Sequence, residues 1–263
     1  MYLLRLYNDT HNEFNVFEVP VLPNEKQTVL SLAGDIYDRK HLMEWLRPLA
    51  ARFKAVVVVL GNHDYWKGDV DRLQVTIKQW QRDNPIPNLH VLFDEAVEID
   101  GTVFFGGTMW TDLNKKDPLT MISDKPFNDF RMIRYENYIK RWSPKEQYRR
   151  HYVYRQKLWN TLALPEHQGK RFVVLSHHAP HQLSSDPRRT DRIENGFYTS
   201  DLSELILDHP QIVLWHHGHT HYKNWYYIGD TPVACNPRGY IPEGPVKDFD
   251  PEMIIDLDAM PVP

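Results

Sequence analysis

The chain has 263 residues, a formal net charge of −4 at pH 7, and 41% hydrophobic and 25% charged residues, which is ordinary for a soluble globular protein. These values exclude a disordered or fibrous chain, and no apolar run reaches the roughly 18 residues that a membrane-spanning helix needs. The acidic balance gives no general attraction for nucleic acid, which we do not expect as a partner. A single cysteine, Cys235, cannot form an internal disulfide, so we expect a cytoplasmic location.

Apolar, β-branched runs bounded by glycine or proline predict strands along the whole chain. They lie at 3–7, 28–32, 55–60, 91–93, 103–105, 172–175, 212–215, 225–228, 233–235 and 253–256. Apolar residues at helical spacing predict helices over 39–53 and 69–81. Ser143, Pro144 and Glu146 have the spacing of a helix start, for a helix that should reach about residue 164. A further helix begins near Ser200.

The order of these elements predicts the architecture. Strand and helix alternate in the first half, as in βαβ units, and the second half is richer in strands. We therefore expect one domain over residues 1–263, an α/β fold with two mixed sheets flanked by helices. Residues 107–142 are polar and lack periodicity. A loop that long inside a domain is usually functional or disordered, so we interpret this segment as a lid-like insertion.

Five polar motifs each follow a predicted strand. They lie at 9–11, 34–39, 61–64, 176–180 and 216–221. Because ligand sites in open α/β sheets lie beyond the carboxyl ends of the strands, the five motifs can meet at one rim. Each motif alone is typical of an ordinary turn. The prediction of a site therefore depends on their common placement.

In their order along the chain, these motifs resemble the D-x-H, GDxxD, GNH[DE], H and GHxH motifs of the calcineurin-like metallophosphoesterase superfamily. The resemblance covers residues 9–221. It implies a four-layer αββα sandwich and hydrolysis of phosphate esters by a hydroxide that bridges two divalent metal ions. It also implies seven ligands, which are Asp9, His11 and His221 for one metal, Asn62, His177 and His219 for the other, and Asp35 between both.

The residue types agree with such a centre. Imidazoles combined with carboxylates suit manganese, which we expect first, and also iron, zinc or nickel. Two carboxylates, neutral imidazoles and the neutral Asn62 amide leave two divalent ions with a net positive charge, even with a hydroxide between them. That charge attracts a phosphate and offsets the negative charge that builds up during in-line attack.

The resemblance gives catalytic roles to three further residues. His63 would contact the phosphate and donate a proton to the leaving oxygen, and Asp38 would orient its ring. Arg39 would bind phosphate oxygens, as in the protein-phosphatase branch. The candidates for substrate binding are Arg39, His178, Asn128 and Arg131.

Several assignments stay open at this point. His178 can face the substrate or can only support the neighbouring ligand. His216 and His217 can replace the last two ligands or merely flank them. Asp64 suits a helix cap or an acceptor behind the ligands better than a ligand.

The substrate class has more than one interpretation. The two histidines of GHxH and Asp64 in place of glutamate favour a phosphodiesterase for small-molecule phosphate esters, whereas Arg39 favours a phosphomonoesterase or protein phosphatase. A non-catalytic interaction scaffold of the same fold is a third alternative. Segments 127–131 and 236–240 are either polar turns or substrate-facing. The natural substrate, the metal and the oligomeric state do not follow from the sequence.

Overall fold

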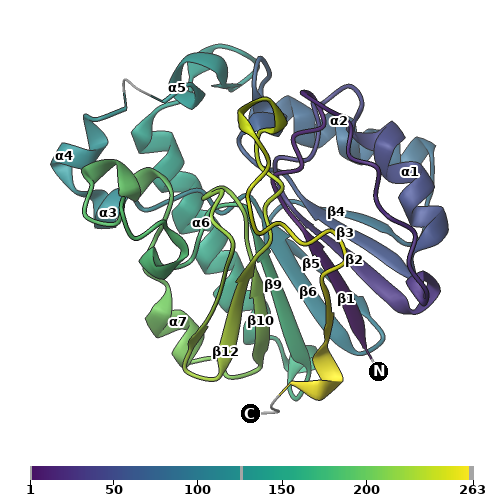
Figure 1. Cartoon of the computed structure of the whole chain (residues 1–263). Coiled ribbons are helices and arrows are strands. Elements are labelled where there is room, and N and C mark those ends of the chain that lie inside the picture. The colour runs from purple at the N-terminus through teal and green to yellow at the C-terminus, as the bar shows by residue number, and fades with distance from the viewer. Residues whose placement is uncertain (1, 125–126, 261–263) are drawn as a thin grey trace.

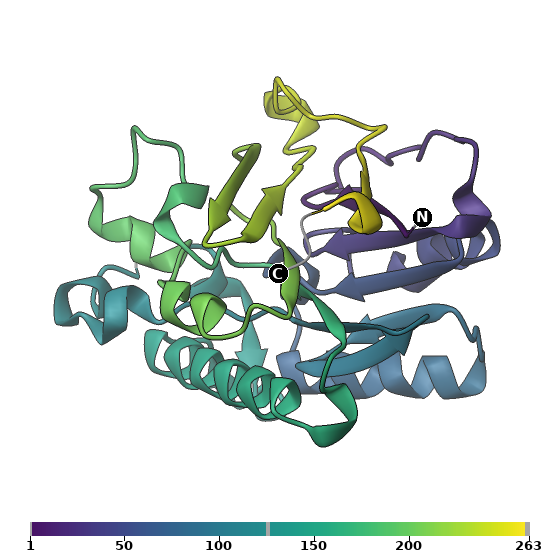
Figure 2. The same ribbon diagram turned by 90° about the horizontal axis from the view of Figure 1, so that it is seen from below.

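A computed structural model of the chain describes residues 2–124 and 127–260. Two large sheets pack face to face, and helices cover both outer faces (Figures 1 and 2). The architecture is the four-layer αββα sandwich that the sequence predicts. Among the described residues, no helix combines the length and apolar character needed to cross a lipid bilayer.

The first sheet has the strand order β13-β1-β2-β3-β4. Its strands are β1 (Leu3–Tyr7), β2 (Thr28–Ala33), β3 (Ala55–Val59), β4 (Leu89–Leu92) and β13 (Ile254–Asp256). β1 to β4 are parallel, and β13 pairs antiparallel with β1. Both faces of the sheet are covered, which explains why these strands are nearly continuous apolar runs.

The second sheet has the strand order β11-β12-β10-β9-β6-β5. Its strands are β5 (Glu95–Ile99), β6 (Thr102–Gly107), β9 (Arg171–Ser176), β10 (Ile212–His216), β11 (Asn224–Ile228) and β12 (Thr231–Cys235). The four inner strands are parallel, and both edge strands are antiparallel to their neighbours.

The helices fall on opposite sides of the sandwich. α1 (Leu42–Arg52) and α2 (Val70–Asp83) pack on the first sheet, and α6 (Pro144–Leu162) and α7 (Ser203–Leu207) on the second. As predicted, α6 starts after Ser143, whose hydroxyl accepts from the Glu146 backbone N–H at 3.3 Å. That bond satisfies one of the free donors at the helix start.

The segment 107–142 carries short elements of its own. They are α3 (Leu113–Lys116), α4 (Pro118–Met121), α5 (Asp129–Met132), β7 (Arg134–Tyr135) and β8 (Lys140–Arg141). The last two form a small hairpin. Residues 125–126 of this segment lie outside the described residues, and a lid function remains a prediction.

The core between the sheets fixes where the functional loops meet. Leu6 and Val57 of the first sheet pack in one buried cluster with Phe104, Leu175 and Leu214 of the second, and this apolar burial holds the sheets together. The parallel strands of both sheets run in a common direction away from the end where the chain termini lie (Figure 1). Their carboxyl ends therefore form one rim.

Candidate metal centre and active site

The seven side chains predicted as metal ligands lie together at this rim. They follow five different strands, three in the first sheet and two in the second. They are Asp9, His11, Asp35, Asn62, His177, His219 and His221. Positions up to 212 residues apart along the chain thus contribute to one site.

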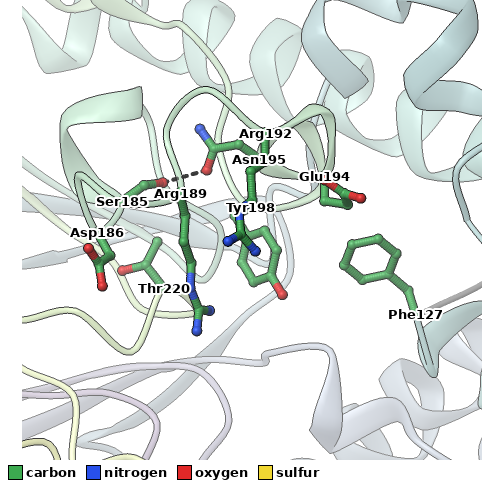
Figure 3. Close-up of a pocket in the computed structure, with 9 residues that line it drawn as sticks. All are labelled: Phe127, Ser185, Asp186, Arg189, Arg192, Glu194, Asn195, Tyr198 and Thr220. Atoms are coloured by element: carbon green, nitrogen blue, oxygen red, sulfur yellow. Dashed lines mark hydrogen bonds between the residues drawn. The ribbon is translucent and has the colours of Figure 1, made fainter.

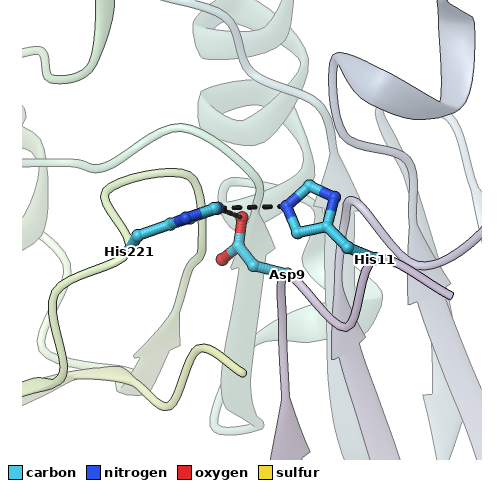
Figure 4. A group of neighbouring side chains, drawn as sticks. All are labelled: Asp9, His11 and His221. Carbon is cyan, nitrogen blue, oxygen red and sulfur yellow. Dashed lines mark hydrogen bonds and ion pairs between the residues drawn. The ribbon is translucent and has the colours of Figure 1, made fainter. Parts of the chain in front are cut away.

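Three of these side chains form a first group of donor atoms. The Nε2 atom of His221 lies 3.2 Å from Asp9 Oδ1 and 3.0 Å from His11 Nε2. Figure 4 shows the three side chains pointing toward one another from two loops. Their donor atoms all lie within 4.8 Å of one another, so a single cation can contact all three.

A second group surrounds His177. Its Nε2 atom lies 3.4 Å from Asp35 Oδ2 and 2.9 Å from Asn62 Oδ1, and His219 completes a second trio with His177 and Asp35. The same Asp35 Oδ2 atom is 3.7 Å from His11 Nε2 in the first group. Asp35 therefore stands between the two groups, where a bridging ligand would have to lie.

The electrostatics of this cluster fit divalent cations. Burial opposes ionisation of Asp35, but the facing imidazoles of His177 and His63 outweigh it and hold the pKa of Asp35 well below its usual value. Although burial acts against it, Asp35 also raises the pKa of His177 to about 9. In the absence of metal, protonated imidazoles balance the charge of the buried carboxylates. Bound metal ions would supply the same positive charge.

Motif glycines let the ligand loops approach closely. A Cβ atom on Gly61 would overlap the Asp35 carboxylate, and one on Gly218 would lie 2.8 Å from Asp9 Oδ2. Gly34 has a φ of +85°, and a Cβ there would overlap the His177 ring. Space therefore requires glycine at all three positions, and at Gly34 the left-handed backbone requires it as well.

Five of the seven predicted ligands have a left-handed backbone. Their φ angles are 50° for Asp9, 45° for His11, 53° for Asp35, 70° for His219 and 47° for His221. Only a few per cent of residues other than glycine adopt such angles. Strained conformations of this kind cluster at functional sites because the surroundings enforce them.

Further side chains hold the ligands in place. Asp129 accepts hydrogen bonds from Asn62 Nδ2 at 2.9 Å and from Trp66 Nε1 at 2.7 Å, which leaves the Asn62 oxygen turned toward His177. The Nδ1 atom of His177 donates to the Ala33 carbonyl at 2.9 Å. Partners of this kind fix the orientation of metal-binding side chains.

His63 lies beside the ligands, and its ring is held on three sides. It stacks on Trp66 with ring centres 3.5 Å apart. Its Nδ1 atom is 3.4 Å from Glu13 Oε1, and its Nε2 atom is 2.9 Å from the Tyr240 hydroxyl. Glu13 also accepts from His11 Nδ1 at 3.0 Å, so one carboxylate supports a predicted ligand and the predicted proton donor together.

The structure gives Asp38 and Arg39 partners other than the predicted ones. The Asp38 carboxylate accepts from the ring of His41 at 2.8 Å and from the Lys40 backbone N–H at 2.8 Å, because it caps the turn that leads into α1. It is not among the partners of His63 in the described chain. The Arg39 guanidinium donates to the Tyr138 hydroxyl at 3.5 Å and does not line the cavity beside the ligands.

The other candidates for substrate binding lie at different distances from the cavity. Asn128 lines the cavity beside the ligands. Arg131 is exposed and donates to Asn128 Oδ1 at 2.6 Å, so it supports that side chain from outside. His178 is buried behind the site, with its ring centre 4.1 Å from that of His219, and burial lowers its pKa well below the usual value. His178 is not among the residues that line the cavity beside the predicted ligands, and its position fits the alternative of a residue that supports the neighbouring ligand.

His216 and His217 are engaged away from the centre. His216 Nδ1 lies 2.8 Å from the Ser31 hydroxyl, and His217 Nε2 lies 2.8 Å from the Ser184 hydroxyl. Both rings are fully buried. They therefore flank the two predicted ligands of the GHxH motif, and their ring nitrogens are engaged elsewhere.

Asp64 lies behind the ligand loops as an acceptor. Its carboxylate accepts from four backbone N–H groups, those of Gly61 at 2.6 Å, Asp35 at 3.0 Å, and Ile36 and Tyr37 at 3.2 Å. The side chain thus joins the loop after β2 to the loop after β3. This agrees with the interpretation of Asp64 as an acceptor behind the ligands.

Replacing Asp64 with alanine should destabilise the whole chain. Four buried donors would lose their acceptor, and we expect the free energy of unfolding to fall by about 4 kcal/mol. Urea unfolding followed by circular dichroism measures this. The exposed Asp83→Ala variant removes the same group and should stay within about 0.5 kcal/mol of the parent. Equal midpoints for the two variants would contradict this role of Asp64.

The sequence did not identify Glu13, Tyr240 or Asp129 as parts of the site. Tyr240 and Asp129 lie in segments 236–240 and 127–131, which sequence reasoning left open, and both segments reach the centre. Glu13 stands two positions after His11 and belongs to no motif, so only the fold reveals its contact with His63.

Comparisons with known proteins agree with this geometry. A family model described as calcineurin-like phosphoesterase matches residues 5–227. An uncharacterized protein of Acanthamoeba polyphaga mimivirus is 24% identical over 294 residues, covering 99% of this chain and 98% of that protein.

Solved structures share the fold at low sequence identity. Phosphopantetheinyl hydrolase from Mycobacterium tuberculosis superimposes with a TM-score of 0.71 at 15% identity, over 91% of this chain and 90% of that one. A protein of Thermus thermophilus has a TM-score of 0.50 at 13% identity, over 89% of this chain and 83% of that one.

Proposed function

The chain belongs to the calcineurin-like phosphoesterase family, and on this premise we propose that it hydrolyses phosphodiesters of small molecules with two divalent transition-metal ions, manganese first. The observation that carries the proposal is the position of Asp35. One of its oxygens lies between two groups of buried imidazole and carboxylate donors, and this arrangement suits a pair of ions with a shared ligand.

The proposed ligands are those of the two groups. Asp9, His11 and His221 would hold one ion, and Asn62, His177 and His219 the other, with Asp35 shared. When bound, such a pair supplies an electrophile for the phosphoryl oxygens and lowers the pKa of an attacking water.

The chain's own residues would then assist departure of the alcohol. His63 lines the cavity beside the ligands, and we assign it the donation of a proton to the leaving oxygen. Glu13 and Trp66 orient its ring through the ion pair and the stacking described above. The Tyr240 hydroxyl lies within hydrogen-bond distance of His63 Nε2, and Tyr240 lines the same cavity.

Two observations favour a diester over a monoester. The cavity beside the ligands has a volume of about 470 Å³ and continues into a second of about 320 Å³, which leaves room for groups on both sides of the scissile phosphate. Arg39, which argued for the protein-phosphatase branch, is engaged with Tyr138.

The test is turnover of paired substrates. We expect the manganese-loaded protein to hydrolyse bis(para-nitrophenyl) phosphate with a kcat/KM about tenfold above that for para-nitrophenyl phosphate. A chelator should abolish both activities and added manganese should restore them. Faster monoester hydrolysis would reject the diester preference, and no turnover with manganese, iron, zinc or nickel would favour the non-catalytic scaffold. A phosphopantetheinyl ester belongs in the panel because a hydrolase of that name shares the fold.

A further inference from the structure

A second cavity opens directly from the one that holds the proposed metal ligands. The two share five lining residues, which are Phe127, Asp186, Arg189, Tyr198 and Thr220. Thr220 stands between the ligands His219 and His221 in the chain. A molecule bound with its phosphate at the centre can therefore extend into the second cavity without leaving the protein surface.

The wall between the cavities is aromatic. The Tyr198 ring stacks on that of His219 with centres 4.8 Å apart and planes at 30°. The Phe127 ring also contacts Tyr198, edge to face, with ring centres 5.9 Å apart. A flat or apolar portion of a substrate can pack against the open sides of such rings.

The charged groups of the second cavity favour an anion. Arg188, which lines the first cavity, is paired with the Asp186 carboxylate through its Nε atom at 3.0 Å. Arg189 and Arg192 line the cavity, and their guanidinium groups make no hydrogen bond or ion pair with any described residue. Figure 3 shows both extending into the space that the lining residues surround, with Arg189 running beside Thr220, whereas Glu194 turns toward Phe127.

Two guanidinium groups in one cavity suit an oxyanion. Each presents a planar fork of N–H donors that matches the oxygens of a carboxylate or a phosphate. Because Arg188 neutralises Asp186, Glu194 is the one lining carboxylate that still opposes them. The cavity is therefore net positive on a chain whose overall charge is −4.

We propose that Arg189 and Arg192 form a second anion-binding subsite, so that the preferred substrates are phosphodiesters whose retained alcohol carries a further carboxylate or phosphate beyond a flat or apolar portion. This inference rests on the proposed function, since it defines which phosphodiesters the same centre accepts. The scissile phosphate would lie at the ligands, and the second anion would lie past Tyr198.

Matched esters test this specificity. Para-nitrophenyl phenyl phosphate is compared with the analogues that carry a carboxylate or a phosphate at the far end of the phenyl ring, and all three release para-nitrophenol. We expect kcat/KM of the parent chain to be about fivefold higher for the charged esters, since the arginines are exposed. In Arg189→Gln/Arg192→Gln this ratio should fall to about one. The carboxylate and phosphate arms show which anion the subsite prefers.

A matched control and a binding measurement complete the design. Lys145→Gln/Arg155→Gln removes two exposed charges from α6 outside both cavities and should keep the ratio. Calorimetry measures Kd for phenylphosphonate and para-carboxyphenylphosphonate. The parent should bind the carboxylated compound more tightly, whereas the double variant should bind both equally. Equal values for charged and uncharged compounds in the parent chain, in turnover or in Kd, would overturn the subsite. Absence of all turnover with a preserved contrast in Kd would instead reject the proposed function and leave the subsite standing.

Discussion

Asp35→Asn should remove both metal ions from the protein. The substitution keeps the size of the side chain but takes away the charge shared between the two groups of donors. We expect metal affinity to fall by more than the roughly 10–100-fold typical of residues that only support a ligand. Activity should drop to about 1% or less of the parent value, because two-metal chemistry needs both ions. Elemental analysis after loading with manganese and dialysis measures the metal content directly.

The control for this prediction is Asp83→Asn, which changes the charge of an exposed residue by the same amount. It should retain the parent's metal content. If Asp35→Asn still carries two equivalents of metal, Asp35 does not bridge the groups. Loss of one equivalent with the other retained would place Asp35 on a single ion.

His63→Gln should separate proton donation from metal binding. His63 is not one of the seven proposed ligands, although with Glu13 it forms a third group of possible donors around the ligand His11. The other two groups do not contain it, so we expect both ions to stay bound. Turnover should fall by about 10²–10³-fold, the range of a lost general acid. The loss should be larger for alkyl leaving groups than for para-nitrophenol, because a poor leaving group depends more on receiving a proton. Rates across a series of alcohols of graded pKa measure this, and a uniform loss would reject the assignment.

The same series distinguishes Glu13 from Asp38 as the partner of His63. Glu13→Gln should reduce activity by about 10–100-fold, since it weakens the support of both His63 and His11. Asp38→Asn makes an equal change in charge but affects a carboxylate that pairs with His41, so its rates should stay within about twofold of the parent. The reverse ranking would restore the role that the sequence suggested for Asp38.

The fold could be predicted from the sequence where burial dictates residue type. Strands such as β3 and β9 are covered on both faces, and their continuous apolar runs are visible without a structure. β5 was missed because it is an edge strand of mixed composition, in which only Ile99 is buried. The two-residue strands β7 and β8 are too short to carry any periodicity.

The candidate site could also be predicted only in part. The spacing of the motifs brought seven donors to one rim, because each motif is anchored to the end of a strand. The partners of those donors were harder to foresee. Adjacency in sequence pointed to Asp38, but the turn before α1 directs that carboxylate to His41. Glu13 and Tyr240 reach His63 through loops whose left-handed residues and long-range contacts leave no local pattern.

The division of ligands between the two sheets has a consequence for folding. The four proposed ligands that follow β1, β2 and β3 belong to the first sheet, and the three histidines that follow β9 and β10 belong to the second. Neither sheet alone can assemble the complete set, so catalytic competence should appear only after the halves have docked, late in folding. Metal ions that bind only when the two sheets are docked would link one sheet to the other. By mass action, they would stabilise the folded state against unfolding.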